Sequence, residues 1–240
     1  MDTRQQLDCS FCTLKERCVG AGVSSFQSPT SAPGKQDRVY FRGEKINNYD
    51  SEPGVVLVKS GLLRVLRKLP SGTLVTIDLI TTGDMLTYPL LFSLQDTKRI
   101  VEALDTSEVC FIPAASFNEW LKHSDSARSR LVKWTGLEFL RREEQICSLS
   151  HRSVRERTAE ALIYLAERFG SPHGEGLGIP TLLTREDIAA LIGTARESVV
   201  RQLAEFKDEG CITLDGRQIV VRKVDQLKRI AKVEVSPKVV

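Results

Sequence analysis

Residues 183–203 constrain the fold of this chain more than any other stretch of its sequence. Thr184 is a favourable helix N-cap, and Asp187 follows it at the spacing of a capping box. Thr194 and Glu197 have the same spacing, and the single glycine between the two boxes can adopt the positive φ angle that ends a helix. The stretch therefore predicts two short helices joined by a tight turn, which is a helix-turn-helix.

The segments around this motif complete a domain. Residues 152–169 have the pattern of an amphipathic helix, and residues 171–180 that of a loop. Gly210 is a suitable end for the second helix, and an Asp-Gly turn at residues 215–216 predicts a β-hairpin after it. Such a hairpin is a wing, so residues 151–240 are expected to form a winged helix-turn-helix. In the first helix, Ile188, Leu191 and Ile192 form one apolar stripe, and the second helix should have a buried face made of Val199, Val200, Leu203 and Phe206.

Polar side chains gather on the first turn of the second helix. In the major groove of DNA, an arginine can pair with guanine O6 and N7, and a carboxylate can accept a hydrogen bond from cytosine N4. Alternatively, Glu197 and Arg201 form an ordinary i,i+4 ion pair on a solvated helix face. Because two capping boxes surround the turn, we favour the interpretation that these side chains recognise bases of double-stranded DNA. The candidate DNA-binding residues are Thr194, Arg196, Glu197, Ser198 and Arg201.

The composition is that of a folded protein with two domains. The chain has 240 residues, of which 41% are hydrophobic and 27% are charged. It has no apolar run long enough to span a membrane and no N-terminal secretory signal, so we expect a cytoplasmic protein with no membrane partner. A net charge of +3 neither requires nor excludes nucleic acid. The histidines are scattered and no nucleophile–base pair stands out, which argues against an enzyme.

Three cysteines lie close together near the N-terminus, at Cys9, Cys12 and Cys18. In a reducing compartment, clustered thiols indicate a metal or redox site before disulfides. These three can converge on one soft metal centre, although an iron–sulfur cluster or a structural zinc ion needs a fourth ligand. The alternative is three unrelated cysteines in a tail. Residues 1–37 are expected to form this tail and a connector rich in Gly, Ser and Pro.

Residues 38–123 contain many short runs of β-forming residues, separated by Gly, Ser, Pro and Asp turns. This pattern predicts an antiparallel barrel of the jelly-roll kind, which would act as the sensor domain of an α+β protein. The expected strands are Val39–Phe41, Gly54–Val58, Leu62–Leu66, Leu74–Leu79, Ile100–Ala103 and Val109–Ile112.

Residues 124–150 are expected to form one long helix that begins at Ser124 or Ser126. Along it, a stripe of residues recurs at alternating spacings of three and four, which favours a partner helix. The stripe could instead pack on the chain's own barrel, with Arg142 reaching water. Because a DNA reader must match two half-sites, we favour a dimer interface. Its predicted residues are Val132, Thr135, Phe139, Arg142, Ile146 and Leu149.

The order of these parts resembles the CRP/FNR family of bacterial transcription regulators over nearly the whole chain. The C-x2-C-x5-C tail is similar to that of the FNR branch, as are residues 103–113 and 156–165. The resemblance assigns Cys110 as the fourth ligand, whereas periodicity alone would make it a buried strand thiol. It implies a cyclic-nucleotide-binding-type jelly-roll β-barrel, a dimerisation helix, a winged helix-turn-helix and a [4Fe–4S] cluster that senses oxygen.

The resemblance also implies how these parts act together. An intact cluster would order the tail against the barrel and the start of the long helix, and oxidation would release them. Two Arg142 side chains facing one another would repel, so the homodimer would be marginal without the cluster. RNA polymerase is a further partner implied for an activator. A structural zinc site and a disulfide-forming thiol sensor are the alternatives to the cluster.

The recognition helix departs from the FNR branch. Residues 196–201, with the sequence R-E-S-V-V-R, resemble the R-E-x-x-x-R pattern of CRP proteins. We therefore expect a palindromic DNA site with GTGA-like half-sites, in which Arg196 and Arg201 contact guanines and Glu197 contacts a cytosine. Residues 97–98 are Thr-Lys where members that bind cyclic AMP have an arginine beside a hydroxyl, so no nucleotide is expected. Cys147 and Cys211 are expected to be packing thiols.

Overall fold

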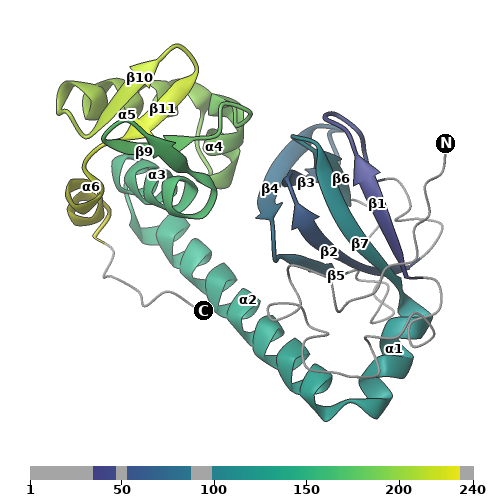
Figure 1. Cartoon of the computed structure of the whole chain (residues 1–240). Coiled ribbons are helices and arrows are strands. Elements are labelled where there is room, and N and C mark those ends of the chain that lie inside the picture. The colour runs from purple at the N-terminus through teal and green to yellow at the C-terminus, as the bar shows by residue number, and fades with distance from the viewer. Residues whose placement is uncertain (1–34, 47–52, 88–98, 233–240) are drawn as a thin grey trace. The chain divides into compact units, whose positions relative to one another are not determined.

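In the computed structural model, the chain divides into two compact units, Met1–Phe139 and Leu140–Val240, which we call the N-terminal and the C-terminal unit. The structure describes residues 35–46, 53–87 and 99–232. The long helix α2, Asp125–His151, begins in the first unit and ends in the second (Figure 1). Among the described residues, no helix combines the length and the apolar character needed to cross a membrane.

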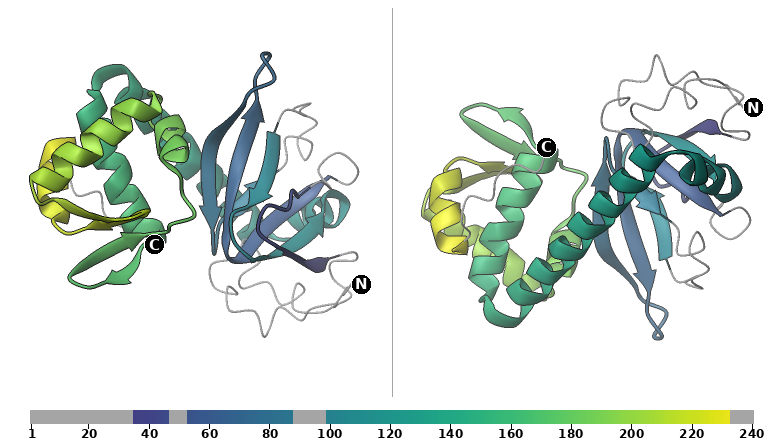
Figure 2. Two further views of the ribbon diagram at one scale, coloured as in Figure 1. Left: turned by 90° about the horizontal axis from the view of Figure 1, so that it is seen from above. Right: turned by 90° about the horizontal axis from the view of Figure 1, so that it is seen from below.

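The N-terminal unit contains the predicted β domain. Its described strands form two antiparallel sheets, one in the order β1-β7-β2-β5 and the other in the order β4-β3-β6. The β3–β4 hairpin extends past the other strands of its sheet (Figure 2). The bounds are β1 Gln36–Tyr40, β2 Gly54–Ser60, β3 Leu62–Lys68, β4 Leu74–Thr81, β5 Met85–Thr87, β6 Arg99–Ala103 and β7 Ser107–Pro113.

Two apolar cores lie on the two faces of the four-stranded sheet. The side chains of β7 alternate between them, because successive residues of a strand point to opposite faces. Val109 and Phe111 belong to the core shared with the three-stranded sheet, whereas Cys110 and Ile112 belong to the core on the outer face. This outer face is covered by α1, Ala114–His123, and by the first turns of α2.

The start of α2 is fixed by Ser124. Its hydroxyl accepts a hydrogen bond from the Ala127 amide at 3.2 Å, so Ser124, rather than Ser126, provides the cap. Ala127 and Leu131 then pack in the outer core with Trp120 of α1. The first turns of α2 are thereby part of the N-terminal unit's hydrophobic core.

The C-terminal unit combines a helix-turn-helix with a four-stranded antiparallel sheet in the order β10-β11-β9-β8. Its first helix, α3, begins at a capping box between Ser153 and Glu156 and contacts α5, α6 and β9. The bounds are α3 Val154–Phe169, β8 Ser171–His173, β9 Gly176–Ile179, α4 Arg185–Leu191, α5 Arg196–Asp208, β10 Ile212–Asp215, β11 Gln218–Val221 and α6 Val224–Ala231.

The structure corrects the expected loop and one expected core residue of this unit. The predicted loop at residues 171–180 contains the β8–β9 hairpin. In this hairpin Leu177 pairs with Pro172 on one side and with Val221 of β11 on the other. The local sequence does not reveal this hairpin, because it forms by pairing with the edge of β11. Val200, expected to be buried, is 45% exposed, because it lies one position beyond the buried Val199 on the helix surface.

Candidate nucleic-acid interface

The first helix of the helix-turn-helix begins as its sequence predicts. The Thr184 hydroxyl accepts a hydrogen bond from the Asp187 amide at 3.1 Å, and the Asp187 carboxylate accepts one from the Thr184 amide at 3.0 Å. This is a complete capping box. Asp187 is only 3% exposed, so the box fixes the start of α4 within the packed domain.

The turn after α4 depends on Gly193, whose φ angle is +62°. The Gly193 amide donates to the Ala190 carbonyl at 3.3 Å, and the Thr194 amide donates to the Ala189 carbonyl at 3.0 Å. These two bonds form a Schellman motif, which satisfies the last carbonyls of α4. A β-carbon on this glycine would lie 2.7 Å from the end of the Leu149 side chain, which could shift, so the positive φ angle is what favours glycine here.

The second predicted capping box, between Thr194 and Glu197, is wrong. Helix α5 starts one residue later than expected, with Ala195 as its N-cap and no side-chain cap. The reason is the Schellman motif, in which the Thr194 amide closes α4 and holds this residue in the turn. Glu197 consequently occupies the second position of α5, with its side chain directed to solvent.

The candidate DNA-binding residues lie on one accessible surface. Thr194 and Ser198 are partly buried, whereas Arg196, Glu197 and Arg201 are exposed. In the described part of the chain, no ion pair joins Glu197 to Arg201, so the alternative interpretation of these two residues is not realised. The opposite face of α5 is anchored in the core by Val199, Leu203 and Phe206, which are at most 2% exposed.

Val200 is a residue of this surface that the sequence interpretation placed in the core. It lies one helical turn after Arg196, on the exposed side of α5. An apolar side chain at such a position can contact the methyl group of thymine in the major groove. The strict i,i+4 spacing from Arg196 could have identified it.

The wing is held against the start of α4. The loop between β10 and β11 consists of Gly216 and Arg217, one residue later than the predicted Asp-Gly turn, because Asp215 still pairs with Gln218. The Arg185 guanidinium donates to the Arg217 carbonyl at 3.1 Å. Burial lowers the pKa of Arg185 from its ordinary value. This contact positions the wing beside the helix-turn-helix.

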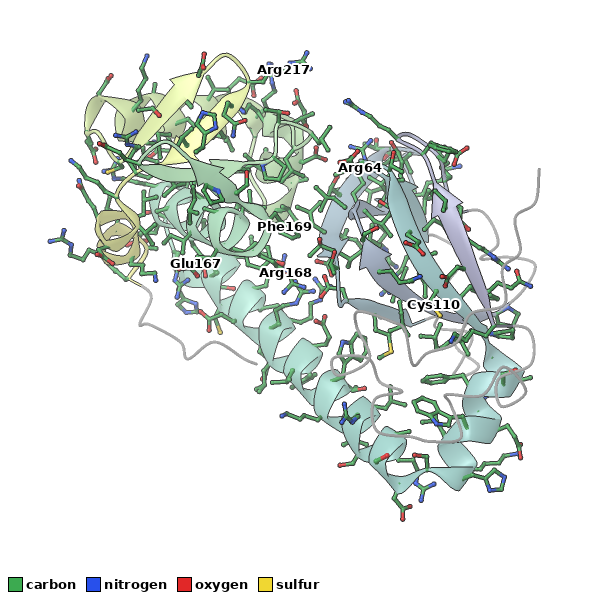
Figure 3. All side chains as sticks on the ribbon, in the orientation of Figure 1. Arg64, Cys110, Glu167, Arg168, Phe169 and Arg217 are labelled. Atoms are coloured by element: carbon green, nitrogen blue, oxygen red, sulfur yellow. The ribbon has the colours of Figure 1, made fainter. Side chains whose placement is uncertain are left out.

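Of the four predicted metal ligands, Cys110 alone lies within the described residues (Figure 3), and Cys9, Cys12 and Cys18 lie outside them. Cys110 is 7% exposed and belongs to the outer core, which also contains Ala127 of α2. Within the described ranges, no group of three or more His, Cys, Asp or Glu side chains is arranged to hold a metal ion.

The two remaining cysteines differ from one another. Cys211 is fully buried, and burial raises the pKa of its thiol, so it is a packing thiol as expected. Cys147 was expected to be a packing thiol as well, but it is exposed on α2. The prediction for Cys147 is therefore wrong. Adjacent residues of a helix point in different directions, and here Ser148 lies on the buried side of α2 while Cys147 faces solvent.

The predicted interface on α2 is accessible to solvent. Val132 is 71% exposed, Phe139 64% and Ile146 62%, and Leu149 is also exposed. Thr135 is exposed and bonds the Leu131 carbonyl, whereas Arg142 is partly buried and donates to Gln145 at 3.2 Å. The described part of the N-terminal unit thus does not cover Val132, Thr135 or Phe139, which leaves this stripe open to another surface.

Two family models match the chain, a cyclic nucleotide-binding domain at residues 38–124 and a Crp-like helix-turn-helix domain at residues 156–230. Together with the fold, they define a DNA-binding transcription regulator rather than an enzyme. The chain belongs to the CRP/FNR family of such regulators.

Individual relatives agree with this assignment. The chain is 25% identical to the CRP-like cAMP-activated global transcriptional regulator of Mycobacterium tuberculosis, over 76% of this chain and 83% of the relative. It is 23% identical to the fumarate and nitrate reduction regulatory protein of Escherichia coli, over 94% and 90% of the two chains. The structure of FixK2 from Bradyrhizobium japonicum has the same fold, with a TM-score of 0.71 at 21% identity over 84% of this chain and 99% of FixK2. These relatives include both CRP-like and FNR-like regulators, so they do not single out one branch of the family.

Proposed function

We propose that this regulator binds a palindromic DNA site as a homodimer, and that an oxygen-labile [4Fe–4S] cluster held by Cys9, Cys12, Cys18 and Cys110 controls this binding. The observation that carries the proposal is the position of Cys110. It lies in the core that contains the first turns of α2, and in the sheet it pairs with Asp37 of β1, the strand that follows the cysteine tail.

The donor set fits an iron–sulfur group. Thiolates are soft ligands, and four of them are the usual complement for such a cluster. The cluster, when bound, supplies iron–thiolate bonds that oxygen can destroy. Cys110 pairs with Asp37 of β1 and shares a core with the first turns of α2, so it could link the order of the tail to the position of α2.

The exposed stripe on α2 supports the homodimer. Members of the family are dimers, and a helix face with Val132, Phe139 and Ile146 in solvent gains stability when another copy covers it. Two-fold symmetry then presents two α5 helices to two half-sites. The charge of Arg142 within this stripe keeps the dimer weak enough for the cluster to decide association.

The surface of α5 supports a GTGA-like half-site. Arg196 and Arg201 would contact guanines, Glu197 a cytosine, and Val200 the thymine methyl group. Thr194, in the turn before α5, and Ser198, in the first turn of α5, would contact the DNA backbone. A regulator of this kind acts in the cytoplasm and, as an activator, contacts RNA polymerase.

The test is an absorption spectrum of protein purified without oxygen, recorded before and after air, with DNA binding measured in both states. A brown protein that loses its colour and its operator affinity in air supports the proposal. A colourless protein with bound zinc, or one controlled by reversible disulfides, contradicts it in favour of a structural or thiol-based site.

A further inference from the structure

An ion pair joins the two helices of the helix-turn-helix across its turn. The Nε atom of Arg196, the first residue of α5, lies 2.7 Å from Oε1 of Glu186, the second residue of α4. Both side chains are more than half exposed, so the pair lies at the surface that would meet DNA. An exposed pair of this kind adds little to stability. Because the pair involves the arginine that is proposed to read DNA, its main effect would be on base recognition and not on stability.

The pair restrains Arg196 in a useful orientation. A guanidinium contacts guanine O6 and N7 with two of its N–H groups. Because Glu186 takes the Nε atom, the two Nη atoms are left for that contact, and within the described residues no other partner of Arg196 is recorded. A long side chain that is already oriented loses less conformational entropy when it binds.

The Glu186 carboxylate also disfavours contacts between Arg196 and DNA phosphates, which do not depend on the base sequence. Away from a guanine, an unrestrained arginine can turn to a phosphate, which strengthens nonspecific binding. Turning Arg196 in that way would break its bond with Glu186 and leave a negative charge near the DNA backbone. This free-energy cost applies only when Arg196 has no guanine to contact. It therefore weakens binding to other sequences and raises specificity without any new contact to the correct site.

We propose that Glu186 is a positioning residue that sets the specificity of DNA reading by Arg196. The inference rests on the proposed DNA-reading role of Arg196 and on neither the cluster nor the GTGA sequence. Its chemistry requires a negative charge at residue 186 and a guanine opposite residue 196.

The test uses the full-length protein purified without oxygen. The probe is the duplex that the wild-type protein itself enriches from a random-sequence library, together with copies altered at each base pair and a random duplex. The variants are Glu186→Gln, Glu186→Asp and Arg196→Ala. The matched control is Glu167→Gln, which also removes one negative charge paired with a cation, Lys228, in the C-terminal unit. Figure 3 shows Glu167 far from Arg217 of the wing.

The expected result is a change confined to one base pair and to nonspecific binding. Glu186→Gln should bind random duplex about two- to fivefold more tightly and lose about two- to fivefold of the preference for guanine at the Arg196 position, the size of an exposed ion pair. Glu186→Asp should recover part of that preference, whereas Glu167→Gln should keep it whole. Equal thermal stability of the variants separates the effect from unfolding.

Two further outcomes are informative in different ways. If Glu186→Gln keeps the wild-type base preferences and the wild-type ratio of specific to nonspecific affinity, the inference is wrong although the proposed function stands. If no duplex is enriched, or if Arg196→Ala leaves every base preference unchanged, the proposed reading role of Arg196 fails, and the inference fails with it.

Discussion

The buried Ser148 hydroxyl of α2 donates a hydrogen bond to the Glu160 carboxylate of α3 at 2.5 Å. Arg152 donates to the same carboxylate and also to Glu144, at 2.9 Å for the latter bond. One acidic side chain thereby holds the end of α2, the turn after it and α3 together. These bonds connect the last turns of α2 to α3, the helix on which α5 packs.

Removal of Glu160 should destabilise the C-terminal unit. We predict that Glu160→Ala lowers its free energy of unfolding by about 2 kcal/mol, because Ser148 and Arg152 lose a shared acceptor. Calorimetry of the full chain measures the effect. Both tryptophans, Trp120 and Trp134, lie in the N-terminal unit, so their fluorescence should not report it. Glu143→Ala, an exposed change on α2, is the control; an equal loss there would contradict the argument.

The two threonines of the helix-turn-helix should differ in their effect on stability. Thr184→Ala removes a side-chain cap and should cost about 1 kcal/mol. Thr194→Ala should change the free energy of unfolding by less than about 0.5 kcal/mol, because Thr194 contributes its backbone amide, and not its hydroxyl, to the turn. Denaturant titration compares them. Equal losses in the two variants would indicate that the Thr194 hydroxyl does cap α5, as the sequence predicted.

The fold was largely predictable because its signals are local. The Thr184 cap, the glycine at position 193 and the Asp-Gly pair at residues 215–216 act within a few residues of themselves, and the structure contains the elements that they predict. The β8–β9 hairpin was missed because its strands are short and depend on pairing with β11. Helix α6 was missed as well, although one of its faces buries Leu227 and Ala231.

The candidate site was predictable only in part. Position on a helix suggests that Arg196, Glu197 and Arg201 face DNA, and their roles stay predictions. The link from Arg196 to Glu186 could not be predicted, because it crosses the turn and depends on the angle between two helices. Val200 was misplaced for a simpler reason, because adjacent residues of a helix point in different directions and only Val199 belongs to the buried face of α5.

Acid should weaken the contact between α3 and the end of α6. The Lys232 ammonium, 2.6 Å from Glu156, and the Ser153 amide lower the pKa of Glu156 from 4.5 to about 2. Because the folded-state pKa lies below the unfolded value, this stabilisation is present above pH 4.5 and is lost as the pH falls toward 2. Glu156→Gln should therefore lower Tm at neutral pH and match the wild type near pH 2. A Tm difference that persists in acid would point to packing instead.

The cysteines provide a direct test of the cofactor. Under anoxia, Cys110→Ser should lose the bound iron, because a serine hydroxyl is a poor ligand compared with a thiolate. Cys147→Ser should keep it, because Cys147 is exposed on α2 and outside the proposed donor set. Iron and sulfide analysis of both variants tests whether Cys110 is a ligand of the cluster. Retention of iron in the Cys110 variant would remove this residue from the ligands.

Self-association should depend on the charge of Arg142. In a two-fold dimer that buries the α2 stripe, the two copies of this guanidinium approach one another among apolar side chains, where like charges repel strongly. Arg142→Ala removes the repulsion and leaves Val132, Phe139 and Ile146 in place. We predict that this variant, with the cluster removed, dimerises about tenfold more tightly than the wild type in analytical ultracentrifugation.

Two companion variants separate charge from shape. Arg142→Lys keeps the positive charge and should associate as weakly as the wild type, whereas Phe139→Ser removes apolar area and should weaken association in either background. If Arg142→Ala stays monomeric while Phe139→Ser still disrupts the dimer that forms with the cluster, the stripe is the interface but repulsion does not control it. If neither variant alters association, another surface joins the two copies, because a residue that is 64% exposed in the monomer and central to a dimer cannot be changed to serine without effect.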